Sequence, residues 1–317
     1  MITTVTPNPS LDRTLHLHRF ARGNVNRAST TMVEPSGKGV NVALALHGVG
    51  VDVRAVLPVG GSAGREIASL LDDHGLEHID VAIAGAVRSN ISLIEGDGLS
   101  TKVNEPGPQL SDAEVDALYA ATLAGSDVGE WVVWAGSLPG GFTPQRFADA
   151  VADTRATGRL VAIDSSGPAL TQVLSQYGDR LPHMVKPNAE ELAEVTDRDL
   201  TTLGDVADAA QVLLARGVRT VLISLGHNGA LLVDADLPRP LHGRAAARRV
   251  VNTVGAGDAL LAGWLAALHA GATTADAFAN ALRFGATAVE HEGTLLGVPD
   301  PHRPVTITPA EALTPLV

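Results

Sequence analysis

The amino-acid sequence predicts an α/β protein of three layers, in which helices cover both faces of a mostly parallel central sheet, with a small β-sheet lid beside them. From residue 111 onward, short β-branched runs alternate with segments of helical period, which is typical of such a layered sheet. Around residues 13–34 and 88–104, polar and apolar residues alternate instead, as in strands that expose one face to water. With 317 residues, 45% of them hydrophobic, the chain is long enough for one large domain or two smaller ones, and we expect a single domain over residues 1–317.

The composition argues against several classes of protein. A net charge of −12 does not suit a general binder of nucleic acid or of membrane surfaces, although local Lys and Arg residues can still form a pocket for an anion. The chain has no Cys, which removes disulfides, thiol catalysis and Cys-ligated zinc. The amino terminus does not resemble a signal peptide and no apolar run has transmembrane length, so we expect a cytoplasmic location.

The amino-terminal half is predicted to contain central strands, two helices and the lid. The segment 88–104 is typical of a hairpin, because two alternating stretches flank a glycine-containing turn at 96–98. The expected central strands are 2–6, 51–59 and 79–83, the helices are 40–46 and 64–74, and the lid strands are 13–18, 27–33, 88–95 and 99–104.

The carboxyl-terminal half follows a regular βα pattern. Its first helix opens with a capping box formed by Ser111 and Glu114. Right-handed crossovers would bring the loops after the strands to one edge of the sheet. Residues 248–251 are interpreted as the end of an extended segment, and the tail after Gly297 as a cap on the domain. The expected strands are 130–135, 160–164, 183–186 and 220–225, and the helices begin at 111, 143, 167, 187, 206, 258 and 274.

A turn with the sequence Gly-Ala-Gly-Asp at residues 255–258 is the first candidate for a catalytic element. Its two glycines let backbone N–H groups approach an anion, and a helix N-terminus adds free donors and positive potential. Asp258 could accept a proton from a substrate hydroxyl beside these donors, which is the arrangement that phosphoryl transfer needs. From this stretch alone, a simple helix N-cap is an equally good interpretation of Asp258.

A second loop, Gly-Lys-Gly at residues 37–39, precedes a helix of small apolar residues. It is not a Walker A loop, but Lys38 and Asn41 stand among glycines where polar contact with a ligand is favoured. Asp12 follows the first strand, at the end where open α/β sheets bind ligands, although an ordinary turn Asp would look the same.

These segments together resemble the ribokinase-like (PfkB-type) carbohydrate kinases nearly from end to end. Residues 36–43 resemble the amino-terminal signature of that family and residues 252–258 the carboxyl-terminal one. Two shorter matches lie between them, Lys-Pro-Asn-x-x-Glu at 186–191 and Ser-x-Gly-x-x-Gly at 224–229. Ser36 stands where a Gly is usual, and Asn252 where an Asp is usual. The opening at residues 6–12 and the Gly-Lys-Gly loop are most similar to the phosphosugar branch, the 1-phosphofructokinases and then the tagatose-6-phosphate kinases.

The resemblance implies a role for each matching residue. Asp258 would be the base, and the amides of Gly255, Ala256 and Gly257 would stabilise the transferring phosphoryl group. The sugar would contact Asp12, Gly37, Lys38 and Asn41, and its phosphate would contact Arg88, with Arg27 and Lys102 as further candidates. The phosphates of ATP would contact Lys186 and Asn188, with Glu191 reaching Mg²⁺ through water. The rest of the nucleotide would adjoin Ser224, Leu225, Gly226, His227, Asn228, Gly229, Gly257 and Asp258.

The expected reaction is therefore ATP-dependent phosphorylation of fructose 1-phosphate to fructose 1,6-bisphosphate, with ATP and Mg²⁺ as cofactors. Kinases of tagatose 6-phosphate or fructose 6-phosphate are alternatives, and so is a non-catalytic sugar or nucleotide sensor, although a sensor needs no base. A dinucleotide-dependent oxidoreductase is excluded, because no Gly-x-Gly-x-x-Gly follows the first strand. A homodimer formed through the lid is one further use of the small sheet.

Overall fold

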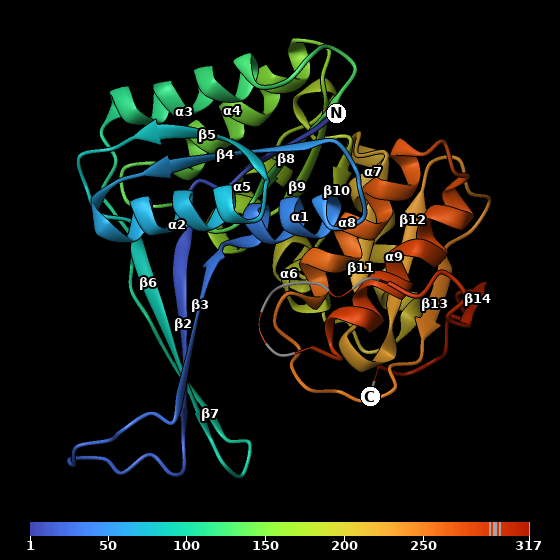
Figure 1. Ribbon diagram of the computed structural model, residues 1–317. Coiled ribbons are helices and arrows are strands. Elements are labelled where there is room, and N and C mark those ends of the chain that lie inside the picture. Colours follow the sequence, from blue (N-terminus) through green and yellow to red (C-terminus); the bar gives the residue numbers. More distant parts are fainter. Residues whose placement is uncertain (292, 294–296, 298, 317) are drawn as a thin grey trace.

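A ten-stranded sheet forms the centre of the computed structural model, which describes residues 1–291, 293, 297 and 299–316 (Figure 1). The strand order is β14-β13-β12-β11-β10-β9-β8-β1-β4-β5. Neighbours run parallel from β11 to β5, whereas β12, β13 and β14 are added antiparallel at one edge. The strands are β1 (Ile2–Val5), β4 (Val53–Val59), β5 (Glu77–Ala82), β8 (Trp131–Ala135), β9 (Leu160–Asp164), β10 (Met184–Val185), β11 (Thr220–Ser224), β12 (Ala230–Asp234), β13 (Leu241–Ala245) and β14 (Val305–Pro309).

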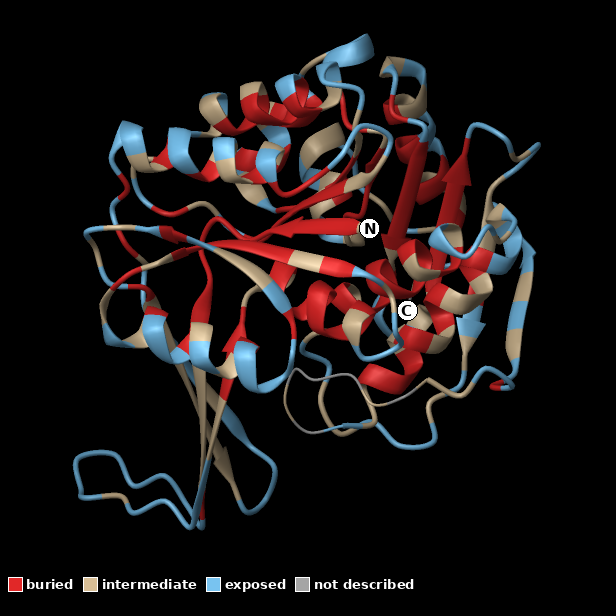
Figure 2. Ribbon diagram, turned by 45° about the horizontal axis from the view of Figure 1, so that its top comes forward, coloured by how far each residue is buried: buried red, intermediate tan, exposed pale blue. Residues whose placement is uncertain are grey.

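Helices cover both faces of this sheet, because its strands send alternate side chains into two apolar cores (Figure 2). The adjacent residues Val132 and Val133 of β8, for example, belong to opposite cores. Within the described ranges, no helix has the length and apolar character to cross a lipid bilayer. One face carries α1 (Lys38–His47), α2 (Gly61–Asp73), α8 (Ala256–His269) and α9 (Thr274–Ala288), and the other carries α3 (Asp112–Ala124), α4 (Pro144–Ala156), α5 (Gly167–Leu174), α6 (Ala189–Thr196) and α7 (Leu203–Arg216).

A second sheet of four strands projects from the body (Figure 1). Its order is β3-β2-β6-β7, with a parallel pair, β2 and β6, at its centre. Residues that pair across strands lie on the same face. One face is therefore polar, with Asp12, Asn90 and Lys102 among its residues, and the other is largely apolar, with Leu15 and Ile91. The strands are β2 (Ser10–Leu17), β3 (Thr30–Ser36), β6 (Arg88–Glu95) and β7 (Ser100–Asn104).

The structure confirms the fold class and corrects four details. The segment 248–251 is not a strand: Val251 N donates to Val289 O at 2.7 Å, so the end of α9 holds it. The tail forms the edge strand β14, which tolerates Pro309 because an edge strand leaves one side unpaired. The short antiparallel strands β12 and β13 were not expected, since few residues of each show a periodic pattern. Finally, β2 begins at Ser10, so Asp12 lies within a strand of the small sheet.

Candidate active site

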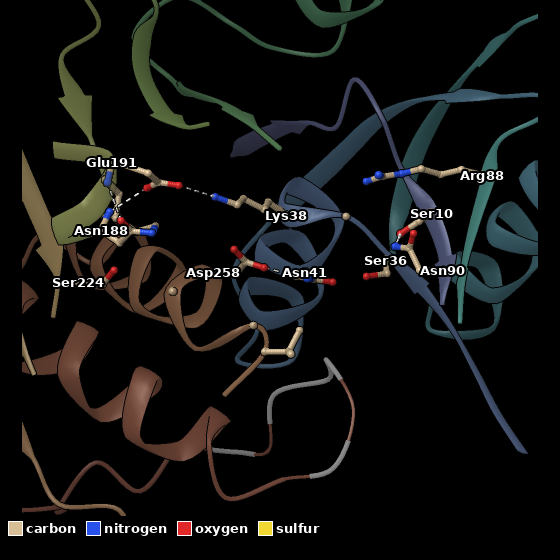
Figure 3. A pocket seen from close by; sticks show the side chains of 15 residues that line it. Ser10, Ser36, Lys38, Asn41, Arg88, Asn90, Asn188, Glu191, Ser224 and Asp258 are labelled. Atoms are coloured by element: carbon tan, nitrogen blue, oxygen red, sulfur yellow. Dashed lines mark hydrogen bonds and ion pairs between the residues drawn. The ribbon is translucent and has the colours of Figure 1, made fainter. Parts of the chain in front are cut away.

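A cavity of about 390 Å³ lies where the two sheets meet, and it collects residues from far-apart segments (Figure 3). Figure 3 shows Asp258 and Asn41 near its middle, Arg88 and Asn90 at the side of the small sheet, and Asn188 and Ser224 at the opposite side. Both glycine loops contribute backbone to its wall. The lining residues are Ser10, Ser36, Gly37, Lys38, Asn41, Arg88, Asn90, Lys186, Asn188, Glu191, Ser224, Val254, Gly255, Gly257 and Asp258.

Asp258 is the third residue of α8 and not its N-cap, which is Gly255 with φ 80°. Its carboxylate makes no capping bond and instead accepts a hydrogen bond of 2.8 Å from Asn41 Nδ2 on α1. This excludes the N-cap interpretation. The side chain is buried, and burial raises the pKa of Asp258 to about 6, helped by the nearby charge of Asp164. The hydrogen bond from Asn41 and the charges of the two cavity lysines oppose this rise.

Those lysines, Lys38 and Lys186, both contact Asp164, which was not among the predicted site residues. Their Nζ atoms lie 2.7 and 3.0 Å from its two carboxylate oxygens. Complete burial would raise the pKa of Asp164, but the charges of Lys186 and Lys38 outweigh burial and keep this pKa below its usual value. The two lysines and Asp164 therefore form a charged group directly beneath the cavity. The only sequence signal was an acidic residue at the carboxyl end of the apolar strand β9.

The glycine turn places free backbone donors in the same cavity. Among the described residues, the N–H groups of Gly257 and Asp258 have no backbone acceptor, as expected in the first turn of a helix. A side chain at position 257 would bring its Cβ within 3.2 Å of Lys186 Nζ, so the turn and the lysine are in close contact. Donors of this kind beside cations and a buried carboxylate can stabilise a phosphoryl group in transfer.

On the side of β10 and β11, Asn188 caps α6. Asn188 Oδ1 accepts from Glu191 N, and Glu191 Oε2 accepts from Asn188 N, both at 2.8 Å. The other oxygen of Glu191 lies 3.9 Å from Lys38 Nζ. Glu191 therefore stabilises the helix start and still faces the cavity. Of the segment 224–229, only Ser224 lines this cavity, while Gly226–Asn228 forms a short 3-10 turn beyond it.

On the side of the small sheet, one predicted residue lines the cavity and three lie further out. Arg88 lines the cavity and donates from Nη2 to Asn8 O at 3.1 Å. Asp12 stands one row further out, where its Oδ1 accepts from Ser10 Oγ and Asn90 Nδ2. Lys102 lies outward of Asp12 on the same face. Arg27 lies in the exposed loop between β2 and β3 and does not line this cavity.

A buried carboxylate, a helix N-terminus and paired lysines at the edge of an α/β/α fold are the parts that a phosphotransferase needs. The model of the pfkB family carbohydrate kinases matches residues 6–301. A 1-phosphofructokinase of Haloferax volcanii is 36% identical over 301 residues, covering 95% of this chain and 94% of the relative. A 1-phosphofructokinase of Vibrio cholerae is 35% identical over 262 residues, covering 83% and 81%.

Solved structures agree with this assignment. The crystal structure of phosphofructokinase-2 from Escherichia coli in complex with potassium has a TM-score of 0.87 at 30% identity, and the match covers 93% of this chain and 94% of that one. A ribokinase from Thermotoga maritima shares the fold, with a TM-score of 0.72. The chain belongs to the pfkB family of carbohydrate kinases. It is a sugar kinase, and kinases of this family use ATP.

Proposed function

We propose that the protein phosphorylates fructose 1-phosphate at its 6-hydroxyl, with ATP as the donor, to give fructose 1,6-bisphosphate. Asp258 carries the proposal, because a buried carboxylate with a pKa of about 6 stands beside free backbone donors in a cavity that the small sheet borders. The relatives named 1-phosphofructokinase, which match over most of the chain, support this substrate.

The proposed chemistry uses Asp258 as general base. Its carboxylate accepts the proton of the 6-hydroxyl while the sugar oxygen forms a bond to the γ-phosphorus of ATP, and the bond from that phosphorus to the bridging oxygen of ADP breaks. A pKa of about 6 leaves the carboxylate mainly ionised at neutral pH, yet makes it a stronger base than an exposed Asp. The free amide of Gly257, the amides of Gly255 and Ala256, of which the latter also donates to Thr253 O at 3.4 Å, and the ammonium groups of Lys38 and Lys186 stabilise the charge that develops on the phosphoryl oxygens.

The opposite side of the cavity suits the triphosphate. Lys186, Asn188 and Ser224 line this side, and the turn from Gly226 to Gly229 follows Ser224 directly in the chain. Mg²⁺ usually binds through one or two carboxylates together with substrate phosphates, and it retains several water molecules. Glu191 suits such a contact through water, since one of its oxygens faces the cavity while the other caps α6. The ion would neutralise phosphate charge when it binds with ATP.

The small sheet is proposed to act as a lid over the sugar. Asp12 and Asn41 are proposed to contact the hydroxyl groups of the sugar, since Asn41 lines the cavity and Asp12 stands beside it on the polar face of the small sheet. Gly37 also lines the cavity, and its loop packs so closely on Thr6 that a Cβ at this position would lie 2.7 Å from Thr6 Cγ2. Arg88 adds positive charge for the phosphate of the sugar.

The cytoplasmic location and the single domain stay predictions.

The largely apolar face of the lid is proposed as the surface of a homodimer. Val103 and Leu99 are 55% and 59% exposed although both are large apolar residues, and an exposed apolar patch on a projecting sheet favours association.

A comparison of four sugars tests the substrate. The purified protein is assayed for ADP release with fructose 1-phosphate, fructose 6-phosphate, tagatose 6-phosphate and fructose. We expect the highest kcat/KM with fructose 1-phosphate. A higher value with fructose 6-phosphate would make that sugar the substrate in place of fructose 1-phosphate; the E. coli phosphofructokinase-2 has a crystal structure in complex with fructose 6-phosphate. Binding of the sugars without ADP release would favour the sensor.

A further inference from the structure

A second cavity, of about 440 Å³, continues outward from the first one. Asn90 and Val254 line both, so the two cavities adjoin. One wall of the outer cavity is the polar face of the small sheet, and the other is the segment 249–254 that leads into the glycine turn. The outer cavity therefore lies between the lid and the segment that leads to Asp258.

The pairing register places Lys102 on the lid wall. Asp12 pairs with Asn90, and two residues further along each strand Thr14 pairs with Ser92, which pairs with Lys102. All five residues line the outer cavity. Two residues of a strand span about 7 Å, so Lys102 lies about one such step outward from the row that contains Asp12.

Arg249 stands on the opposite wall. Its segment is held by the end of α9 and by Asn252, whose Nδ2 donates to Gly293 O at 3.1 Å. Asn252 Oδ1 also accepts from Val254 N at 3.0 Å, which fixes the chain directly before the glycine turn. Arg249 is thus attached to a well-anchored segment six residues before Gly255.

The acidic residues that the structure describes in the outer cavity do not pair with Lys102 or Arg249. Asp12 already accepts two hydrogen bonds, and Glu34 has an interaction of its own. Within the described part of the chain, neither Lys102 nor Arg249 forms an ion pair or a side-chain hydrogen bond. The adjacent Arg248, which does not line either cavity, differs: its Nη2 lies 3.4 Å from Asp300 Oδ2.

We propose that Arg249 and Lys102 bind the phosphate group of the sugar phosphate from opposite walls, which makes Arg249 a specificity-determining residue. The inference rests on the proposed function and extends it. A guanidinium binds phosphate oxygens in pairs, and an ammonium adds a point charge. A phosphate held by both would draw the lid toward the segment before the glycine turn. Arg88 lies four residues before Ser92, at the inner end of the polar face, where it adds positive charge to the first cavity.

Four variants test this inference: Arg249→Gln, Lys102→Gln, the double variant and the matched control Arg248→Gln. Loss of a charge-assisted contact should raise the KM for fructose 1-phosphate about ten- to hundredfold in Arg249→Gln, with the KM for ATP nearly unchanged. Arg248→Gln should stay within about twofold of the wild type. Because both cations contact one phosphate, the effect of the double variant should be smaller than the product of the single effects.

Calorimetric binding of fructose 1,6-bisphosphate without ATP separates this inference from the proposed function. If the wild type fails to phosphorylate fructose 1-phosphate, but Arg249→Gln binds the bisphosphate at least tenfold more weakly than Arg248→Gln, the proposed function fails and the inference holds. If the wild type is active and the two variants match in KM and in binding, the inference is overturned. Absence of bisphosphate binding to the wild type overturns it as well.

Discussion

Replacing Asp258 by Asn separates the chemical role of this side chain from its effect on stability. The substitution keeps the size of the side chain and an oxygen that can accept the hydrogen bond from Asn41 Nδ2, but it removes the charge and the ability to take a proton. A positioned general base contributes about 10²- to 10⁴-fold to a rate. We expect kcat to fall by about that factor, while the KM values for both substrates change much less.

The same substitution should stabilise the folded protein at neutral pH. Burial, and then the charge of Asp164, raise the pKa of Asp258 from 3.8 to about 6. A difference of about 2 units, at 1.36 kcal/mol each, corresponds to about 3 kcal/mol for keeping this carboxylate ionised in the folded state. Because the folded-state pKa is the higher one, this cost is fully present above pH 6. It declines as the pH falls through 6 and disappears below about 4.

Two measurements on the same variant check both expectations. Urea unfolding should show Asp258→Asn more stable than the wild type at pH 8, by up to about 3 kcal/mol, with most of the difference lost at pH 4.5. An ADP-release assay should show the loss of kcat, and the wild-type kcat should decline on the acid side of pH 6. Asp276→Asn is the matched control, because Asp276 is also the third residue of its helix but is exposed. Near-normal turnover in Asp258→Asn, or lower stability at pH 8, would refute the reasoning.

Three further predictions concern the charged group beneath the cavity, the inner end of the lid and its apolar face. Asp164→Asn should lower the free energy of unfolding by about 3–5 kcal/mol, since Lys38 and Lys186 lose their buried partner, and an unchanged urea midpoint would contradict this. Arg88→Ala should raise the KM for the sugar phosphate far more than the KM for ATP; an equal effect on both argues against a phosphate contact. Val103→Glu should shift the protein toward monomer in sedimentation experiments. An unchanged sedimentation coefficient would show that the lid is not the interface.

The sequence was sufficient to locate the glycine turn at the start of a helix, because backbone chemistry leaves a local signature. Glycines at 255 and 257, followed by an Asp and a helical pattern, predict a donor-rich helix start, and the structure has α8 beginning at Ala256. The alternation of residues 88–104 likewise predicted a hairpin, which appears as β6 and β7. Both features depend on residues that are close together in the chain.

The sequence did not reveal features that depend on contacts between residues far apart in the chain. Asp164 looks like any acidic residue at the end of a strand, and its importance comes from Lys38, which is 126 positions earlier. Arg249 looks like a surface charge, because only the fold of the whole chain brings it to the same cavity as Lys102. The edge strand β14 has only a short alternating pattern, Val-Thr-Ile-Thr at residues 305–308, and it is stabilised by pairing with β13.

Because the small sheet has one polar and one apolar face, the number of residues in each strand decides which side chains face the cavities. In β6, Asn90 and Ser92 face the cavities while Ile91 and Leu93 face the other way. Insertion of one residue before Asn90 would invert this order over the rest of the strand. Apolar side chains would then meet the sugar, and polar ones would occupy the proposed contact with a second subunit. Single-residue insertions and deletions should therefore be tolerated in the connecting loops and not within these strands.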